Sequence, residues 1–300
     1  MDERDWLTQR FQEHRPRLRA LAYRMLGSTS EADDALQEAW MRLSRSNAAE
    51  IDNLQAWLLT VVGRVALNML RSRKTRDEQP LEAHLPDPIV DRAEGIDPEH
   101  EALLADSLGL ALLVVLETLT PAERLAYVLH DMFSVPFDQI GVILERSPEA
   151  ARQLASRGRR RIRSAHTTPH HAEASAQQEE VVEAFLAAAR DGDFDALLAV
   201  LDPDIVERVD SGSGTIVEVR GALNVARRAM AASQRDGLVG RRALVNGAPG
   251  WVSVLDGELY AIGALTVHNG RITTMDILLD PARLARLIPT DFLTEFDSRL

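Results

Sequence analysis

Arginine and glutamine side chains gather on one face of a helix predicted over residues 148–165. At 100° per residue, one arc of this helix carries Arg152, Gln153, Ser156, Arg157 and Arg160. Arginine and glutamine can each pair bidentately with a base edge in a DNA major groove, while Arg159 and Arg163 suit phosphates. The pattern favours a helix that reads duplex DNA, although a basic helix that docks on a protein would show the same face.

Small residues occupy another arc of the same helix. Ala151, Ala155 and Gly158 lie there with Leu154 and Ile162. Glycine costs about 1 kcal/mol relative to alanine inside a helix, so we expect a neighbouring helix to pack closely at Gly158. A short helix at 137–144 and a tight turn at 145–147 precede this segment, which predicts a helix-turn-helix.

A second candidate DNA surface lies on a helix predicted over residues 52–76. Trp57, Arg64, Asn68 and Arg71 share one arc, apart from an apolar stripe that includes Leu58. A tryptophan ring can stack on an unstacked base while arginine neutralises phosphate. This face therefore suits single-stranded DNA, unless Trp57 simply packs against a neighbouring helix.

The helix predicted over residues 32–43 has a different surface. Asp34, Gln37 and Glu38 lie beside Trp40. Acidic and amide groups next to an apolar ring favour a protein interface over a DNA surface. The alternative is a solvated acidic face with Trp40 in the core.

Proline-rich breaks and a change of periodicity predict a multidomain fold. Two all-α domains, at 1–76 and 98–165, are separated by a linker at 77–97. A second linker, at 166–176, leads to an α+β domain at 177–300. Its pattern is two helices (177–191 and 194–201) and six strands (204–209, 215–220, 239–246, 250–255, 258–267 and 271–278).

The 300 residues carry a net charge of −12, which alone would argue against a nucleic-acid partner. Residues 1–166 carry only −4, however, and their arginines are clustered, so the local potential can still attract DNA. The absence of cysteine excludes disulfides and thiol nucleophiles. No apolar run approaches the roughly 20 residues of a membrane span, and the N-terminus is acidic, so we expect a cytoplasmic protein without a membrane partner.

Motifs for enzymatic chemistry are missing from the sequence. It has no phosphate-cradling glycine loop, no paired-histidine metal motif and no nucleophile elbow. Asp210, before Ser211-Gly212, is an acid or base candidate but more simply caps a turn. We expect no catalytic residue, metal or cofactor.

Together these features resemble a bacterial sigma factor of the extracytoplasmic-function (ECF) class over residues 1–165. Residues 31–40 resemble its polymerase-binding helix, 56–72 the helix that melts and reads the minus-ten promoter element, and 126–133 with 150–157 the minus-thirty-five reader. The resemblance implies three groups of site residues: Asp34, Gln37 and Glu38 for polymerase; Trp57, Arg64, Asn68 and Arg71 for the minus-ten element; Arg152, Gln153, Ser156, Arg157 and Arg160 for the minus-thirty-five element.

The rest of the chain resembles the cone-shaped SnoaL-like (NTF2-like) domain that one subgroup carries. Three signatures of that subgroup appear in altered form at 84–88, 210–214 and 280–284. The resemblance implies a regulatory, interdomain role for Leu85, Pro86, Asp87, Pro88, Asp210, Gly212, Gly214, Pro281 and Leu284. It also implies a pocket that could hold a small-molecule ligand, which the sequence does not identify.

The resemblance implies a sigma factor that binds core RNA polymerase, recognises promoter DNA and starts transcription, with the C-terminal domain modulating its activity. That domain would fix or block the relative placement of the two DNA-binding domains. One alternative is a ligand-responsive helix-turn-helix regulator that binds duplex DNA alone. A less favoured one is a SnoaL-like isomerase or cyclase, which would need convergent acid and base groups in the pocket.

Overall fold

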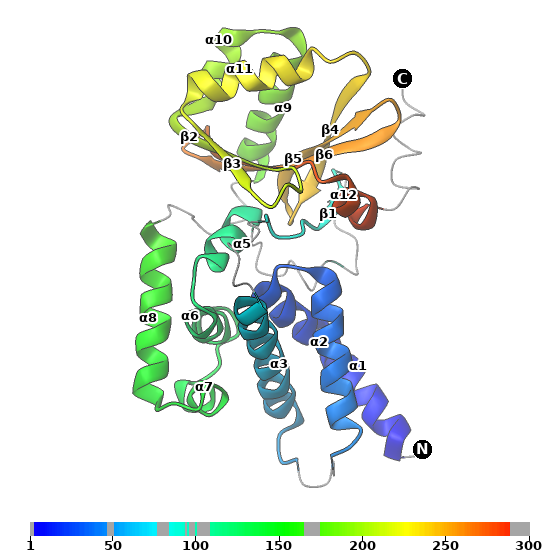
Figure 1. Ribbon diagram of the computed structural model, residues 1–300, viewed down its shortest axis with the longest axis vertical. Coiled ribbons are helices and arrows are strands. Elements are labelled where there is room, and N and C mark those ends of the chain that lie inside the picture. The colour runs from blue at the N-terminus through cyan, green and yellow to red at the C-terminus, as the bar shows by residue number, and fades with distance from the viewer. Residues whose placement is uncertain are drawn as a thin grey trace. The chain divides into compact units, whose positions relative to one another are not determined.

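The computed structural model describes residues 3–46, 51–76, 84–93, 95, 100, 109–164 and 175–288 (Figure 1). The chain divides into two compact units. A helical unit comprises Met1–Pro80, Pro98–Asp106 and Leu113–Thr167, and a sheet unit comprises Leu81–Asp97, Ser107–Leu112 and Thr168–Leu300.

Three long helices form the first half of the helical unit. They are α1 (Glu3–Leu26), α2 (Thr29–Leu43) and α3 (Leu54–Arg76). Helix α1 ends at Gly27, whose φ of +72° is the left-handed conformation that glycine adopts most readily. Apolar side chains from all three helices, such as Leu21, Leu43 and Leu58, are fully buried and form the common core.

Short helices and one longer helix form the second half. The chain runs through α5 (Leu110–Glu117), which enters this unit at Leu113, and then α6 (Pro121–Tyr127), the π-helical turn η2 (Val128–Met132), α7 (Phe137–Leu144) and α8 (Pro148–Ser164). Thr120 and Glu123 form a reciprocal capping box that fixes the start of α6. Glu145, at φ +57°, ends α7, and the Arg146 amide donates to the Gly141 carbonyl over 2.9 Å. This turn sends α8 away from α7, which gives the predicted helix-turn-helix.

A seven-stranded sheet forms the centre of the sheet unit. Its order is β1-β4-β5-β6-β7-β2-β3, and only the β2–β7 pair is parallel. The strands are β1 (Val90–Arg92), β2 (Leu201–Asp210), β3 (Ile216–Arg220), β4 (Leu238–Val245), β5 (Ala248–Leu255), β6 (Glu258–His268) and β7 (Arg271–Leu278). Turns at Asn246-Gly247, Asp256-Gly257 and Asn269-Gly270, all at positive φ, connect the hairpins from β4 to β7.

Helices cover one face of this sheet (Figure 1). They are α9 (Ser175–Asp191), α10 (Phe194–Val200) and α11 (Ala222–Ser233), while α12 (Pro281–Leu287) follows β7. The core between these helices and the sheet includes Val182, Phe185, Leu197, Val225 and Met275. The resulting architecture is α+β, with its apolar core on the helix-covered face.

Three elements were not predicted from the sequence: β1, α11 and α12. Strand β1 lies inside the predicted linker 77–97, whose described part is 84–93 and 95, and it becomes a strand because β4 supplies a hydrogen-bonding partner. Helix α11 is amphipathic and buries Val225 and Ala226, so its 3.6-residue periodicity was a detectable signal in the sequence. Most of the second predicted linker, 166–176, lies outside the described residues.

Candidate nucleic-acid interface

Helix α8 has two sharply different faces. Ala151, Ala155, Gly158 and Ile162 are buried against the preceding helices. A Cβ at Gly158 would lie 3.1 Å from Tyr127 Cβ and 3.4 Å from the Glu123 carbonyl oxygen, so the predicted close approach is present. The five residues predicted to read duplex DNA, Arg152, Gln153, Ser156, Arg157 and Arg160, are all exposed.

Two other arginines of α8 hold the helix in place. Arg159 Nε donates to Asp131 over 2.5 Å, and Arg161 Nη1 donates to Glu123 over 2.8 Å. Arg159, expected to suit a phosphate, is therefore committed to an internal ion pair. Arg163 is exposed in the last turn. The cations that remain on the outer face are mainly those of the predicted reading group.

The predicted single-strand face of α3 is only partly open. Asn68 and Arg71 are exposed, while Trp57 is half-buried. Arg64 is also half-buried, and its Nη2 donates to the carbonyl oxygen of Val142, in α7, over 2.8 Å. The expectation that all four side chains stand on one exposed face is therefore not met at Arg64.

Hydrogen bonds from Arg124 and Arg17 join the two halves of the helical unit. Arg124, in α6, donates from Nε to the Arg24 carbonyl, in α1, over 3.1 Å. Burial lowers the pKa of Arg124 to about 10. Arg17 donates to the Phe133 carbonyl over 3.0 Å, and a Cβ at Gly63 would lie 3.5 Å from Leu125. The α3 face is thus partly covered by the helix-turn-helix half.

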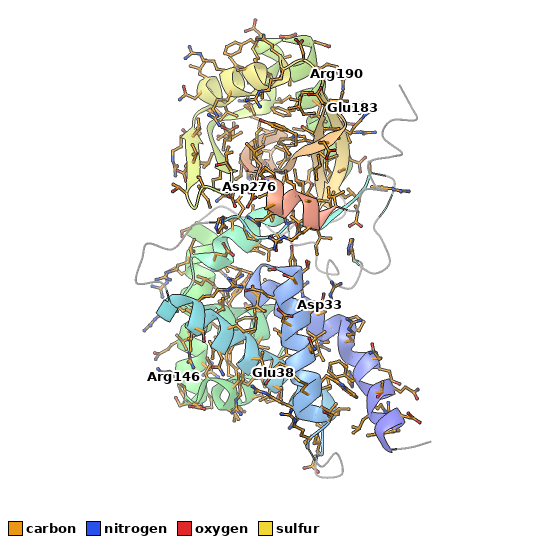
Figure 2. The ribbon with its side chains drawn as sticks, turned by 45° about the vertical axis from the view of Figure 1, so that its right-hand side comes forward. Asp33, Glu38, Arg146, Glu183, Arg190 and Asp276 are labelled. Carbon is orange, nitrogen blue, oxygen red and sulfur yellow. The ribbon has the colours of Figure 1, made fainter. Side chains whose placement is uncertain are left out.

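Helix α2 presents the predicted protein-binding group. Asp34 and Gln37 are exposed, whereas Glu38 accepts from Arg42 Nε over 2.9 Å (Figure 2). Trp40 is half-buried, and its ring centroid lies 5.2 Å from that of Phe11. The indole therefore packs on α1, while the acidic and amide groups remain at the surface.

A cluster of ionised and backbone groups joins residues 84–92 to the rest of the sheet unit. Arg283 Nη1 donates to Asp210 over 2.7 Å, and its Nη2 donates to Asp87 and to the Leu85 carbonyl, each over 2.6 Å. The Leu85 amide donates to Asp210 over 2.8 Å. We call Leu85, Asp87, Asp210 and Arg283 the clamp. Asp210 is fully buried, so its charge is stabilised by these donors rather than by water.

All three altered signature segments meet at the clamp. Leu85, Pro86 and Pro88 are buried, and Leu284 is buried in α12, where Pro281 is the first residue. Gly212 and Gly214 have φ values of +76° and +79°. A Cβ at Gly212 would come within 2.7 Å of the Asp280 carboxyl carbon, so this turn also requires glycine for close packing.

Sequence reasoning missed Arg283, His84 and Asn246. Arg283 lies within the third signature segment, between the predicted residues Pro281 and Leu284. His84 Nδ1 lies 3.5 Å from Asp210, and the Asn246 side chain accepts from the Ile89 amide over 3.2 Å. Arg283 was the detectable signal, because it is the cation of the third signature segment and Asp210 is the acid of the second.

Within the described ranges, no three or more His, Asp or Glu side chains are grouped so that they could hold a metal ion. No helix in the described part of the chain is long and apolar enough to cross a membrane.

The chain is similar to known proteins over nearly its whole length. Residues 10–76 match the family model for Sigma-70 region 2, and residues 109–162 match that for Sigma-70, region 4. The probable ECF RNA polymerase sigma factor SigI of Mycobacterium tuberculosis is 34% identical over 95% of this chain and 97% of its own length. The ECF RNA polymerase sigma factor SigJ of the same organism is 35% identical over 90% and 91%.

The fold agrees with these similarities. The crystal structure of M. tuberculosis SigJ matches with a TM-score of 0.73 at 32% identity, covering 92% of this chain and 97% of that one. The predicted fold class, two helical domains followed by an α+β domain, is confirmed. The chain belongs to the ECF RNA polymerase sigma factors.

Proposed function

We propose that this chain binds core RNA polymerase in the cytoplasm, brings it to promoter DNA and starts transcription without a catalytic step of its own. The observation that carries the proposal is the amphipathic character of α8. Its five proposed DNA-reading side chains are exposed, and its opposite face is buried. A helix presented in this way by a helix-turn-helix fits a major groove. A helix-turn-helix regulator that binds duplex DNA alone is the less favoured alternative, because it gives no role to the surfaces of α3 and α2.

The α8 proposal is tested on the holoenzyme. A promoter fragment is first selected from genomic DNA by the assembled holoenzyme. Arg157→Gln should weaken its binding by about 5- to 150-fold, the range for one base-reading contact of about 1–3 kcal/mol. The matched control is Arg220→Gln, which removes an exposed arginine of the sheet unit. Equal binding by both variants would exclude α8 as the reader.

The exposed acidic face of α2 is proposed to dock on the polymerase. Asp34 and Gln37 have the exposure that an interface residue needs, whereas Asp33 is held by Arg19 over 2.9 Å (Figure 2). Asp34→Lys should therefore abolish co-elution with core polymerase, while Asp5→Lys, on α1, should not. Retained co-elution of the Asp34 variant would exclude this surface.

In the free chain α3 must be released before it can engage DNA. Arg64, proposed for the minus-ten element, donates to the Val142 carbonyl, so its guanidinium is held against α7 in the free chain. We propose that polymerase binding separates α3 from α7. Because the chain has no cysteine, spin labels on Asn68→Cys and Val142→Cys report this distance directly. It should increase on addition of core polymerase, and an unchanged distance would contradict the proposal.

The clamp is proposed to regulate the factor. Residues 84–92, held by Asp210, Arg283 and strand β4, lie in sequence between the two DNA-binding regions. The clamp fixes the backbone of residues 84–92, which would otherwise sample many conformations. It therefore restricts the distances that the linker allows between the two DNA-binding regions. Arg283→Met should therefore widen the range of promoter spacer lengths that support transcription. An unaltered spacer profile and RNA yield would exclude regulation by the clamp.

A further inference from the structure

A cavity of about 1010 Å³ lies in the sheet unit between the sheet and helices α9 and α11. Strands β2, β5, β6 and β7 contribute its floor through residues such as Val209, Trp251, Ala261 and Ile277. Its size is at the upper end of the range for pockets that hold drug-sized organic molecules, roughly 300–1,000 Å³. Neither promoter recognition nor the clamp uses this space.

Small residues create the cavity. Gly240, Ser253 and Ala261 are register partners across β4, β5 and β6, so they lie side by side on the floor where larger side chains would fill the space. In the next row the Trp251 indole lies directly on Gly263, and a Cβ at that position would overlap the ring. Alanines from the helices, among them Ala189 and Ala229, complete the hollow.

The floor is apolar. Met275 and Ile277 line it together with the indole of Trp251, which is 7% exposed, and Phe185 and Leu186 of α9 line the cavity from the helix side. When a ligand covers apolar surface and removes it from water, the free energy falls by roughly 25 cal/mol per Å². The body of a ligand for this site is therefore apolar, and the flat indole favours a ring system.

The rim of the cavity is strongly positive. Five arginines line the cavity, Arg190, Arg228, Arg235, Arg241 and Arg242, against two glutamates, the exposed Glu183 and the buried Glu207. This surplus of three positive charges occurs in a chain whose net charge is −12. The cations therefore concentrate locally at an apolar opening, and such an arrangement attracts an anion.

The rim arginines differ in how they are engaged. Arg228 is paired with the buried Glu207 over 2.5 Å, and Arg242 with Glu183 over 3.5 Å. Arg235 donates to the Tyr260 hydroxyl and lies over its ring. Arg190 forms no ion pair with any described residue, and it lies two turns from Glu183 on α9 (Figure 2). Arg241 is engaged as well. Arg190 and Arg235, whose partner is a hydroxyl rather than a carboxylate, are thus the cations best placed to pair with an anionic ligand.

One hydroxyl lies on the otherwise apolar floor. Ser253, which is 7% exposed, lines the cavity from β5. A hydroxyl can donate one hydrogen bond and accept others. Ser253 therefore supplies one hydrogen-bonding position on the floor.

We propose that this cavity binds an apolar, ring-bearing organic acid. Its ring system would lie on Trp251, its carboxylate would meet Arg190 and Arg235 at the rim, and an oxygen or nitrogen of its body would bond Ser253. Arginine is suited to this role because its planar fork matches a carboxylate. The inference goes beyond the proposed function, since it concerns ligand binding by the free chain and requires neither polymerase nor DNA.

A pair of fluorescent probes with one shared ring system tests the proposal. 8-Anilinonaphthalene-1-sulfonate carries an oxyanion, and N-phenyl-1-naphthylamine lacks it. Titrated into the full-length folded chain, the anionic probe should bind at a single site, at least tenfold more tightly than the neutral probe. The double variant Arg190→Gln/Arg235→Gln should remove most of that advantage while leaving the affinity for the neutral probe within twofold.

Two further variants locate the binding. Arg220→Gln removes an exposed arginine outside the cavity lining and should change neither affinity. Ala229→Trp fills the cavity from α11 and should abolish binding of both probes, with the circular dichroism spectrum and melting temperature confirming that it folds. Equal affinity for the two probes would overturn the acid specificity, and unchanged binding to the folded Ala229 variant would overturn the site.

Discussion

Replacing Arg283 with methionine would remove the charge at the centre of the clamp and keep most of the aliphatic stem. The guanidinium makes four hydrogen bonds, to Asp210, twice to Asp87 and to the Leu85 carbonyl. Its side chain is 10% exposed and that of Asp210 is 0% exposed. Removing one partner of such a buried pair costs about 3–5 kcal/mol, because the other charge stays buried without compensation.

The lower end of that range applies here. Asp210 would retain the amides of Leu85 and Gly212 as donors, over 2.8 and 3.0 Å, so its charge would be partly compensated. A loss of about 3 kcal/mol is a factor of about 150 in the equilibrium for local opening. We therefore expect the amides of residues 84–92 to exchange with solvent deuterium roughly 100-fold faster in the Arg283→Met variant.

Hydrogen–deuterium exchange of the full chain, read by mass spectrometry on peptides covering 84–92, measures this change. Arg220→Met, at a pair whose arginine is 70% exposed, should accelerate the same peptides by less than about fivefold. Asp210→Asn added to the Arg283 variant should slow exchange again, because the uncompensated charge is gone. Exchange at the wild-type rate in the Arg283 variant would refute the clamp as the element that holds this segment.

Substitutions at three other positions have expected outcomes. Glu145 has a left-handed backbone conformation in the turn of the helix-turn-helix, which glycine adopts with less strain. Glu145→Gly should therefore raise the free energy of unfolding, measured in urea, by up to about 1 kcal/mol. Gly158→Ala should be nearly neutral for the free energy of unfolding, because about 1 kcal/mol of helix propensity is offset by a tight contact at 3.1 Å. Gly158→Val, which is larger, should lower the free energy of unfolding by about 1–3 kcal/mol. Burial raises the pKa of Glu207, an effect that Arg228 partly offsets, so the folded state holds this proton more tightly than the unfolded state. Wild-type stability should therefore rise relative to Glu207→Gln as the pH falls from the raised pKa toward 4.5, and a constant difference would contradict that shift.

Local periodicity was enough to predict the α8 surface. The alternation of small and basic residues from Ala151 to Ile162 depends only on the 3.6-residue repeat, and the structure has the small residues buried and the reading group exposed. The hairpins from β4 to β7 were predictable for a similar reason, because Asn-Gly and Asp-Gly turns specify their own geometry.

Contacts between residues far apart in the chain could not be predicted from local sequence patterns. Arg283 and Leu85 are 198 positions apart, and no local pattern pairs them. The bond from Arg64 to Val142 spans 78 positions, so the helix face on which Arg64 lies did not reveal that α7 covers it. The cavity likewise arises from small residues on three strands that become neighbours only in the folded sheet.

Transcription in vitro with purified core polymerase tests the central claim most directly. With a promoter fragment selected from genomic DNA, addition of the full chain should produce RNA from one defined start site. Core polymerase alone should produce none there, and Arg157→Gln should reduce the yield while Arg220→Gln should not. Absence of chain-dependent RNA from every selected fragment would contradict the assignment of this chain as a promoter-directing factor.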